Sequence, residues 1–197
     1  MKRLGERLFR WRETVVMFSK TCEQNVPDPA DPSIFIFDSS NKLPDHLRKE
    51  FTKLRGLGMW IFTWFRMKFR GSRFLCLIEG NRICAYGWAE VSSPFLRRYR
   101  WLIPSAFLLG PFWTAPDQRG RGLYGRLLSK CLAINPDPAK LPVFIHADAT
   151  NTSSLRGIEK AGFQKLGTFE VTSYLMGLWC THKAVSQAGT VCPTDSR

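Results

Sequence analysis

The sequence has few of the residues that build metal centres and disulfide frameworks. Its three histidines are scattered, and its six cysteines include no Cys-x-x-Cys pair. The sequence therefore signals no zinc site. In a chain of 197 residues we expect these cysteines to be small buried hydrophobic residues of a reducing compartment rather than a disulfide framework.

The sequence also lacks a segment that would target it to a membrane. Its first residues, MKRLGER, have no apolar core of a signal peptide. The longest apolar run, 101–115, contains Pro104 and Pro111 and is too short to span a bilayer. We therefore expect a cytoplasmic globular protein, with a single domain over 1–182 and a flexible tail over 183–197, where the composition turns polar.

Acidic residues are scarce, because 16 Asp and Glu stand against 29 Lys and Arg, a formal charge of +13. This balance favours an anionic partner, which is a nucleic acid, an anionic lipid surface or a polyphosphate ligand. No recognised nucleic-acid motif is present, so we disfavour nucleic acid. A helix is expected over 59–70, MWIFTWFRMKFR. It either packs into the core, with its terminal cations complementing the helix dipole, or it contacts a membrane surface or a lipid-like substrate through Trp60 to Phe69.

Hydrophobic patterns predict alternating strands and helices along the chain. A Gly80-Asn81 turn predicts a hairpin, and pairing Glu79 with Arg82 places Cys84 opposite Leu77. Residues 7–20 are expected to form a strand or a hairpin, and the other expected strands are 34–37, 74–79, 82–91, 101–114, 142–148, 163–170 and 171–179. The expected helices begin near 45, 59, 123 and 155.

The stretch PFWTAPDQRGRGLYGRLLSKCL, 111–132, predicts a strand, a glycine turn and a helix. Gly120 and Gly122 tolerate positive φ and leave the backbone open to a ligand, while the first helix amides lack partners. With Arg119 and Arg121 nearby, the turn suits a phosphate group, although an ordinary turn with solvated arginines is the alternative. The third glycine of a dinucleotide fingerprint and the Gly-Lys-Ser/Thr of a Walker loop are both absent.

The run Arg119-Gly120-Arg121-Gly122-Leu123-Tyr124 resembles motif A of the GCN5-related N-acetyltransferases (GNAT), although Tyr124 departs from the small last residue of that motif. A second run, NTSSLRGIEKAGF, is similar to the later family motif in Asn151, Ser154 and Gly162-Phe163. The resemblance covers about 73–180, and 1–72 matches only loosely, as an acceptor-side region. It implies an α/β fold of the GNAT type, with a mixed, mostly antiparallel sheet flanked by helices and splayed central strands.

The resemblance implies acetyl-CoA or another acyl-CoA as cofactor. The pyrophosphate would be held at Gln118, Arg119, Gly120, Arg121, Gly122, Leu123 and Tyr124, mainly by backbone amides. Trp113 and Thr114 would pair with the pantetheine arm, and Asn151 with Ser154 would bind that arm or a nearby amide. A plain helix cap is the alternative for Asn151, and the two roles can coexist.

The implied reaction is direct acyl transfer to a primary amine, which needs a base and a proton donor for the leaving sulfur. The family often has a Tyr donor where this chain has Ile158, so the donor is unassigned. The candidate bases are Glu90, His146 and Asp148. Their structural alternatives are a solvated strand end, a hydrogen-bonded core residue and a turn former, respectively.

These features together predict an N-acetyltransferase that acts on a small amine-bearing acceptor. The basic composition suits an anionic acceptor such as an amino sugar or a sugar nucleotide. Protein N-termini, lysines, antibiotics and a lipid-linked acceptor stay open. A non-catalytic acyl-CoA-binding sensor or interaction module is the alternative, supported by the missing Tyr at Ile158.

Overall fold

The structure is a computed structural model that describes residues 10–21, 28, 30–39, 41–91, 106–174 and 179–187. The chain divides into two compact units. One unit consists of the described residues up to 20 and from 144 onwards, and the other consists of those between 21 and 143.

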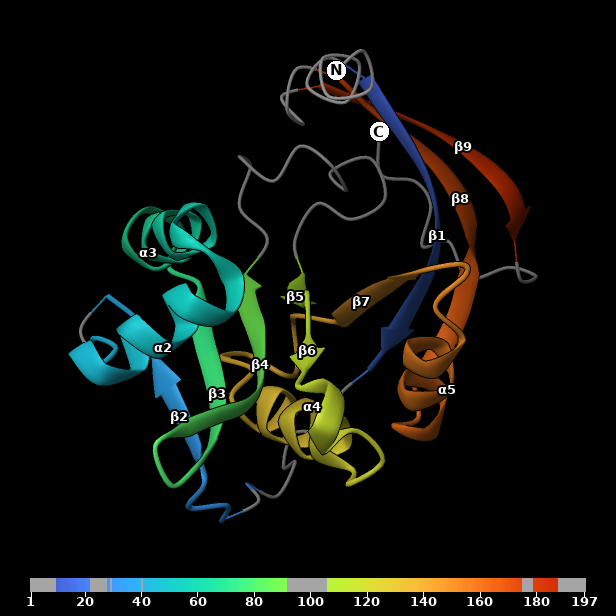
Figure 1. Cartoon of the computed structure of the whole chain (residues 1–197). Helices are drawn as coiled ribbons and strands as arrows, with labels where there is room; N and C mark the ends of the chain where they lie inside the picture. Colours follow the sequence, from blue (N-terminus) through green and yellow to red (C-terminus); the bar gives the residue numbers. More distant parts are fainter. Residues whose placement is uncertain are drawn as a thin grey trace. The chain divides into compact units, whose positions relative to one another are not determined.

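The 21–143 unit is an antiparallel sheet centred on one long hairpin (Figure 1). Strand β4 has β3 on one side and the short strands β5 and β6 on the other, and β2 pairs with β3. The strands are β2 (Ile34–Phe37), β3 (Arg73–Glu79), β4 (Arg82–Val91), β5 (Phe107–Leu109) and β6 (Trp113–Thr114).

The hairpin register corrects one prediction. Glu79 pairs with Arg82 as expected, but a bulge between Leu77 and Ile78 shifts the pairing, so that Leu77 faces Ala85 instead of Cys84. Every residue from Phe74 to Ile78 is buried, so both faces of β3 are apolar. No alternation of polar and apolar residues therefore marks the bulge in the sequence.

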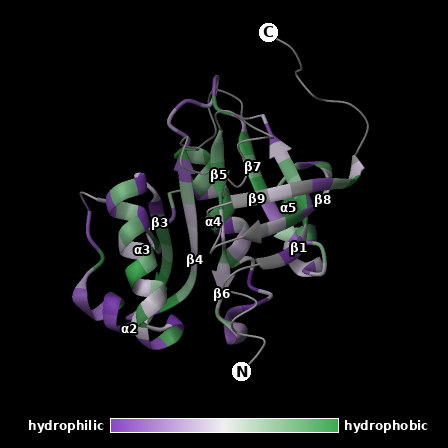
Figure 2. Cartoon of the chain, turned by 90° about the horizontal axis from the view of Figure 1, so that it is seen from above, coloured by the Kyte–Doolittle hydropathy of each residue, from purple (hydrophilic) through white to green (hydrophobic). Residues whose placement is uncertain are grey.

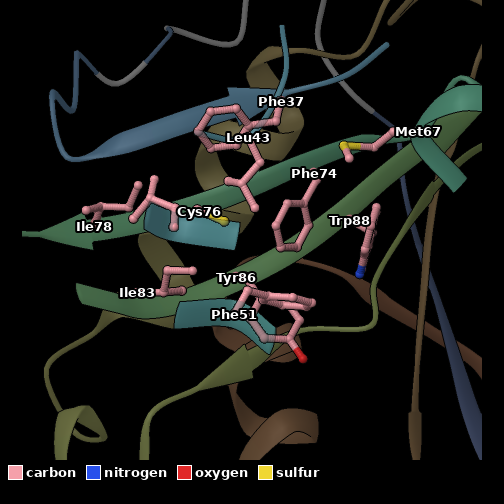
Figure 3. Close-up of a cluster of buried hydrophobic side chains, with 11 residues drawn as sticks. Phe37, Leu43, Phe51, Met67, Phe74, Cys76, Ile78, Ile83, Tyr86 and Trp88 are labelled. Atoms are coloured by element: carbon pink, nitrogen blue, oxygen red, sulfur yellow. The ribbon is translucent and has the colours of Figure 1, made fainter. Parts of the chain in front are cut away.

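Helices α2 (Asp45–Arg55) and α3 (Leu57–Arg70) lie side by side over one face of this sheet (Figure 1). Phe51 from α2 meets Phe74 and Tyr86 edge to face, with ring centroids 5.3 and 5.2 Å apart. Figure 3 shows this cluster, to which β2, β3, β4 and the two helices all contribute. Its members are Phe37, Leu43, Leu47, Phe51, Met67, Phe74, Cys76, Ile78, Ile83, Tyr86 and Trp88.

The opposite face of the sheet carries Leu75, Leu77 and Gly87, since these alternate with the cluster residues along the strands. A Cβ on Gly87 would lie 2.2 Å from the Phe112 ring, so this glycine makes room for that ring. Phe112 in turn packs edge to face on Tyr124 of helix α4 (Leu123–Ala133), at 5.3 Å. Helix α4 therefore covers the face opposite α2 and α3.

The strand expected over 101–114 is wrong as a single element. Residues 101–105 lie outside the described residues, and the remainder forms β5 and β6, which Gly110, Pro111 and Phe112 separate. Gly110 has a φ of 104°, and its peptide bond to Pro111 is cis. Proline donates no backbone hydrogen bond, so a continuous ladder cannot pass through position 111.

The strands of the other unit are β7 (Val143–Asp148), β1 (Arg10–Lys20), β8 (Gln164–Tyr174) and β9 (Trp179–Gln187), and they follow one another in that order across the sheet. Strand β7 belongs to this unit from Phe144 onwards. Strand β8 is antiparallel to both β1 and β9. Helix α5 (Thr152–Lys160) is followed by Gly162 at a φ of 80°, as the sequence predicts.

Two predictions for this unit need correction. Residues 163–174 do not contain a break, because β8 is one strand through Tyr174 rather than two strands divided after Glu170. Strand β9 continues to Gln187, so 183–187 belongs to the sheet and not to a flexible tail. The remainder of the expected tail, 188–197, lies outside the described residues.

The strand pairings described above are antiparallel, and helices flank the strands, so the predicted α/β class with a mostly antiparallel sheet is confirmed. Within the described ranges, no helix is both long and apolar enough to cross a bilayer. Cys76, Cys84 and Cys131 are free and buried, as predicted, and burial raises the pKa of each thiol. Across the same ranges, no three metal-ligating side chains gather into a cation site.

Candidate functional site

The glycine turn has the open backbone that the sequence predicts. After the 3-10 turn η1 (Pro116–Gln118), Gly120 and Gly122 take φ values of 81° and 75°, and α4 begins at Leu123. These values lie in the left-handed region that favours glycine. A Cβ built on either glycine would meet no atom within 4 Å, so the backbone can be approached closely at both positions.

The amides of this turn are free to bind a ligand. In the part of the chain that the structure describes, none from Gly120 to Gly125 donates to a backbone acceptor. The first such bond comes from the Arg126 amide to the Gly122 carbonyl, at 3.2 Å. Unpaired amides at a helix start, together with the helix dipole, favour an anion such as a phosphate.

The two arginines of the turn differ from each other. Arg121 makes a bidentate ion pair with Glu79, both N–O distances being 2.9 Å, and it also donates to Gln118. The hydrogen bond from Arg121 lowers the pKa of the Glu79 carboxyl. Arg119 is exposed and has no ion pair within the described ranges. Arg119 is therefore the cation of the turn that is available to an anion, and Arg121 would have to exchange its partner.

Two ion pairs that the sequence does not signal hold α4 against the chain before β2. Arg126 donates to both Asp31 oxygens at 2.8 and 2.9 Å and to the Ser33 hydroxyl at 2.8 Å. Lys130 contacts both Asp28 oxygens at 2.6 and 2.8 Å. The partners are 95 and 102 residues apart, so no local spacing reveals them. They fix the helix whose N-terminus carries the free amides.

Strand β6 supplies the residues predicted to meet the pantetheine arm. Trp113 and Thr114 pair with Tyr86 and Ala85 of β4, and both are partly exposed. The Trp113 ring stacks on Tyr86 with centroids 5.4 Å apart. Tyr124 lies inward of the turn, partly buried, and burial raises the pKa of its hydroxyl. Such a hydroxyl stays protonated in the neutral range.

Asn151 is the N-cap of α5, as its alternative interpretation predicts. Its side-chain oxygen accepts from the Ser154 amide at 3.2 Å and from the Ser153 hydroxyl at 2.9 Å. Asn151 is exposed and Ser154 is partly buried. Their predicted contact with a cofactor stays a prediction.

The candidate bases lie in different surroundings. Asp148 is exposed and accepts from the Thr150 amide at 2.8 Å and from its hydroxyl, and these hydrogen bonds lower the pKa of the carboxyl. Asp148 therefore stabilises a turn, which is the structural alternative given above for this residue. His146 is partly buried on β7. Ile158, where the resemblance implies a Tyr, has 0% of its surface exposed.

Glu90 is not the solvated strand end that its alternative interpretation describes. Its carboxylate is 5% exposed, contacts Arg66 at 3.2 Å and accepts a hydrogen bond from Ser72. The Arg66 guanidinium also lies 4.3 Å from the Trp88 ring centroid. Burial lowers the pKa of Arg66, and the nearby Glu90 charge opposes this. Glu90 is therefore the anion of a buried ion pair, an arrangement that the sequence does not signal.

The predicted residues fall into two groups by unit. Glu90, Trp113, Thr114 and the turn from Gln118 to Tyr124 belong to the 21–143 unit. His146, Asp148, Asn151 and Ser154 belong to the other unit. The assembly of both groups into one site stays a prediction.

No protein-family model matches the sequence, and no curated protein sequence matches it. Solved structures do match the fold. A protein from Novosphingobium aromaticivorans that is named as an acetyltransferase of the GNAT family aligns with a TM-score of 0.56 and 20% identity, over 82% of this chain and 63% of that one. A GCN5-related N-acetyltransferase from Sphaerobacter thermophilus aligns at 0.53 and 15% identity, over 98% and 58%.

A third structure, AAC(6')-Iy in complex with the bisubstrate analogue CoA-S-monomethyl-acetylneamine, aligns at 0.50 and 12% identity, over 66% of this chain and 89% of that one. The chain spans about three fifths of the length of the first two structures, 63% and 58%. These likenesses show that the chain has the GNAT acetyltransferase fold, so the predicted resemblance is confirmed at the level of the fold.

Proposed function

We propose that this chain, which has the fold of the GCN5-related N-acetyltransferases, transfers an acyl group, in the first instance acetyl, from acyl-CoA to a primary amine. The observation that carries the proposal is the open turn at the start of α4. There, two glycines with positive φ expose amides that have no backbone acceptor in the described part of the chain. Unpaired backbone amides of this kind form an anion-binding site that suits a pyrophosphate.

The residues present fit an acyl-CoA. Amides from Gly120 to Tyr124 would hold the pyrophosphate, and the exposed Arg119 side chain adds charge. Gln118 adjoins the turn, and Trp113 and Thr114 on β6 would face the pantetheine arm. Asn151 and Ser154 would add polar contacts from the start of α5. A bisubstrate analogue containing CoA is bound by AAC(6')-Iy, a structure of the same fold.

When bound, acetyl-CoA supplies an activated thioester. The chain must then remove a proton from the amine and keep the amine in place. Glu90, Asp148 and His146 remain the candidates for the proton acceptor. Asp148 is the most accessible of the three, since it is exposed, whereas Glu90 is 5% exposed and paired with Arg66. Variants H146A, D148N and E90Q, each with a pH–rate profile, distinguish them.

We propose a small amine as the acceptor, an amino sugar or a sugar nucleotide. Its support is the formal charge of +13, which favours an anionic molecule. A panel that also contains peptides with free N-termini, lysine peptides and aminoglycosides tests this choice.

One observation favours a second candidate, a non-catalytic acyl-CoA sensor. Ile158 is fully buried at the position where the resemblance implies a proton-donating Tyr. In the described part of the chain, Tyr124 is the tyrosine nearest in sequence to the turn, and its side chain is partly buried. A sensor would bind acyl-CoA and release no thiol with any amine.

The first test is thermal melting with and without acetyl-CoA. Binding raises the melting temperature by mass action, a gain of ~2.7 kcal/mol at about 100 times the dissociation constant. We expect Gly122→Glu to abolish the shift, because a carboxylate would occupy the anion seat. The matched control is Gly71→Glu, which also places a glutamate at a positive φ with no atom within 4 Å of the new Cβ.

The outcomes separate the hypotheses. A rise in melting temperature with acetyl-CoA that is lost in Gly122→Glu and kept in Gly71→Glu supports pyrophosphate binding at the glycine turn. Thiol release with an amine then supports the enzyme, and binding without release supports the sensor. Equal shifts in both variants, or no shift with any short acyl-CoA, contradict the proposal.

A further inference from the structure

Helix α3 presents an apolar face to solvent. Between 43% and 62% of the surface of each of its large outward side chains is exposed. We call this set the α3 outer face; it consists of Leu57, Ile61, Phe62, Trp64, Phe65 and Phe69. Figure 2 shows the hydrophobic residues, in green, along α3. The rings contact one another, with Phe69 centroids 5.8 Å from Trp64 and 5.0 Å from Phe65.

The inward face of α3 mixes apolar and polar residues. Met67 belongs to the buried cluster, and Met59 and Trp60 pack against it. Thr63 is 0% exposed and Arg66 5% exposed, and Arg66 reaches Glu90. A surface helix ordinarily turns its apolar stripe to the core and its polar residues to water. Helix α3 instead buries Thr63 and Arg66 and exposes six large apolar side chains, so packing within its own unit does not account for the outer face. An exposed apolar surface of this kind marks a contact with another molecule.

Lys68 lies against the α3 outer face, and α3 contains no acidic residue. The Lys68 ammonium lies 5.0 Å from the Trp64 ring centroid and 5.7 Å from that of Phe69. Lys53 in the last turn of α2 and Arg70 at the end of α3 add positive charge before and after the helix, whereas Arg55 lies over the Trp113 ring, 5.9 Å from its centroid. Aromatic and aliphatic side chains with Lys and Arg at their margin are the composition of a helix that lies at a membrane interface.

We propose that the α3 outer face docks on an anionic lipid membrane, with its rings in the headgroup region and its cations on the lipid phosphates. The helix has 14 residues and is about 21 Å long, so it lies on a bilayer and does not span one. A second copy of the chain fits this face less well. In a two-fold contact the same face of the partner would offer no acidic residue of α3 to pair with Lys68.

Co-sedimentation with lipid vesicles tests the proposal. We expect the protein to pellet with phosphatidylcholine vesicles that contain roughly 30% phosphatidylserine, and not with pure phosphatidylcholine. Salt should weaken the binding without abolishing it, because ring insertion is not screened. Phe65→Glu should reduce the partition coefficient at least about tenfold, and Lys68→Ala by a smaller factor on anionic vesicles only.

Phe35→Glu is the matched control. Phe35 is 45% exposed against 49% for Phe65, it lies in the same unit, and it belongs to β2 instead of α3. We expect this variant to bind vesicles like the unmodified chain, and all variants to keep their folded circular dichroism. Absence of binding to anionic vesicles, or equal losses in Phe65→Glu and Phe35→Glu, would overturn the proposal. Self-association that Phe65→Glu removes, without vesicle binding, would assign the face to a second copy instead.

Discussion

At the scale of single residues, the ion pair between Arg66 and Glu90 is buried, so both charges carry a desolvation cost that their neighbours must offset. Both side chains are 5% exposed, and their groups are 3.2 Å apart. The Gly110 carbonyl accepts from Arg66 at 3.4 Å, and Ser72 donates to Glu90, which compensates part of the desolvation. The Arg66 Nε atom is buried without a hydrogen-bond partner. In such a pair, loss of one member leaves a charge that nothing else neutralises.

Glu90→Gln should therefore lower the free energy of unfolding by about 3–5 kcal/mol, because it strands the Arg66 charge. The measurement is denaturant unfolding of Glu90→Gln, Arg66→Met and the double variant, which together form a double-mutant cycle. We expect the double variant to cost less than the sum of the single ones.

The control for this cycle is Asp45→Asn, which breaks the exposed Arg48–Asp45 pair at 3.0 Å. It should cost less than about 1 kcal/mol. Similar small losses in Glu90→Gln and Asp45→Asn would contradict the structural role of the buried pair. A folded Glu90→Gln variant that lost all turnover would return Glu90 to the proton-transfer role.

At the scale of elements, two bidentate ion pairs connect the β3–β4 hairpin to the chain before α4. Arg82 binds Asp117 of η1 at 2.7 and 2.8 Å, and Glu79 binds Arg121 at 2.9 Å on both sides. All four side chains are well exposed, so each pair contributes modestly. Their effect is positional, since they hold both ends of the glycine turn against the hairpin.

Asp117 gives this link a pH dependence. The Arg82 hydrogen bond lowers the pKa of Asp117 from 3.8 to about 2. A carboxyl whose pKa is lower in the folded state stabilises the fold above the unfolded-state pKa, and this contribution disappears as the pH falls through the folded-state value. The unmodified chain should therefore be more stable than Asp117→Asn at pH 5, and the difference should vanish between about pH 4 and pH 2.

Melting temperatures measured from pH 5 to about pH 2 check this expectation. Arg82→Met is the companion variant, because it removes the same pair from the other side. Both variants should lose the same part of the acid dependence. A difference between the unmodified chain and Asp117→Asn that stayed constant over the whole range would show that Asp117 acts without its charge.

The elements also show what the sequence can and cannot predict. The Gly80-Asn81 turn, the glycines at 120 and 122 and the Asn151 cap were predictable, because each is a local requirement of the backbone. The bulge between Leu77 and Ile78 and the Glu90 partner were not, because each depends on residues distant in sequence. The division of β5 from β6 is local, since it follows from Pro111, and the predicted single strand overlooked it. Burial of an ion pair is a tertiary property, and a strand end with Glu90 gives no sign of it.

At the scale of the whole molecule, one unit is assembled from both ends of the chain. Strand β1 pairs with β8 from Arg10↔Tyr174 to Ser19↔Gln164, and β8 pairs on its other side with β9. Contacts between such distant segments form slowly, because the intervening chain must first be ordered. The C-terminal strand covers the outer edge of β8, which carries the buried Phe169 and Val171.

This arrangement predicts different effects for two truncations. Removal of 183–197 deletes the partners of four β8 residues, in the pairs Glu170↔Lys183, Phe169↔Ala184, Thr168↔Ser186 and Gly167↔Gln187. We expect it to cost about 1–3 kcal/mol and to speed hydrogen exchange along β8, since an edge strand loses its ladder. Removal of 188–197 deletes none of these pairs and should leave exchange along β8 unchanged. Equal stability of the two truncated chains would mean that 183–187 behaves as a tail after all, and β8 would then be the true edge of this sheet.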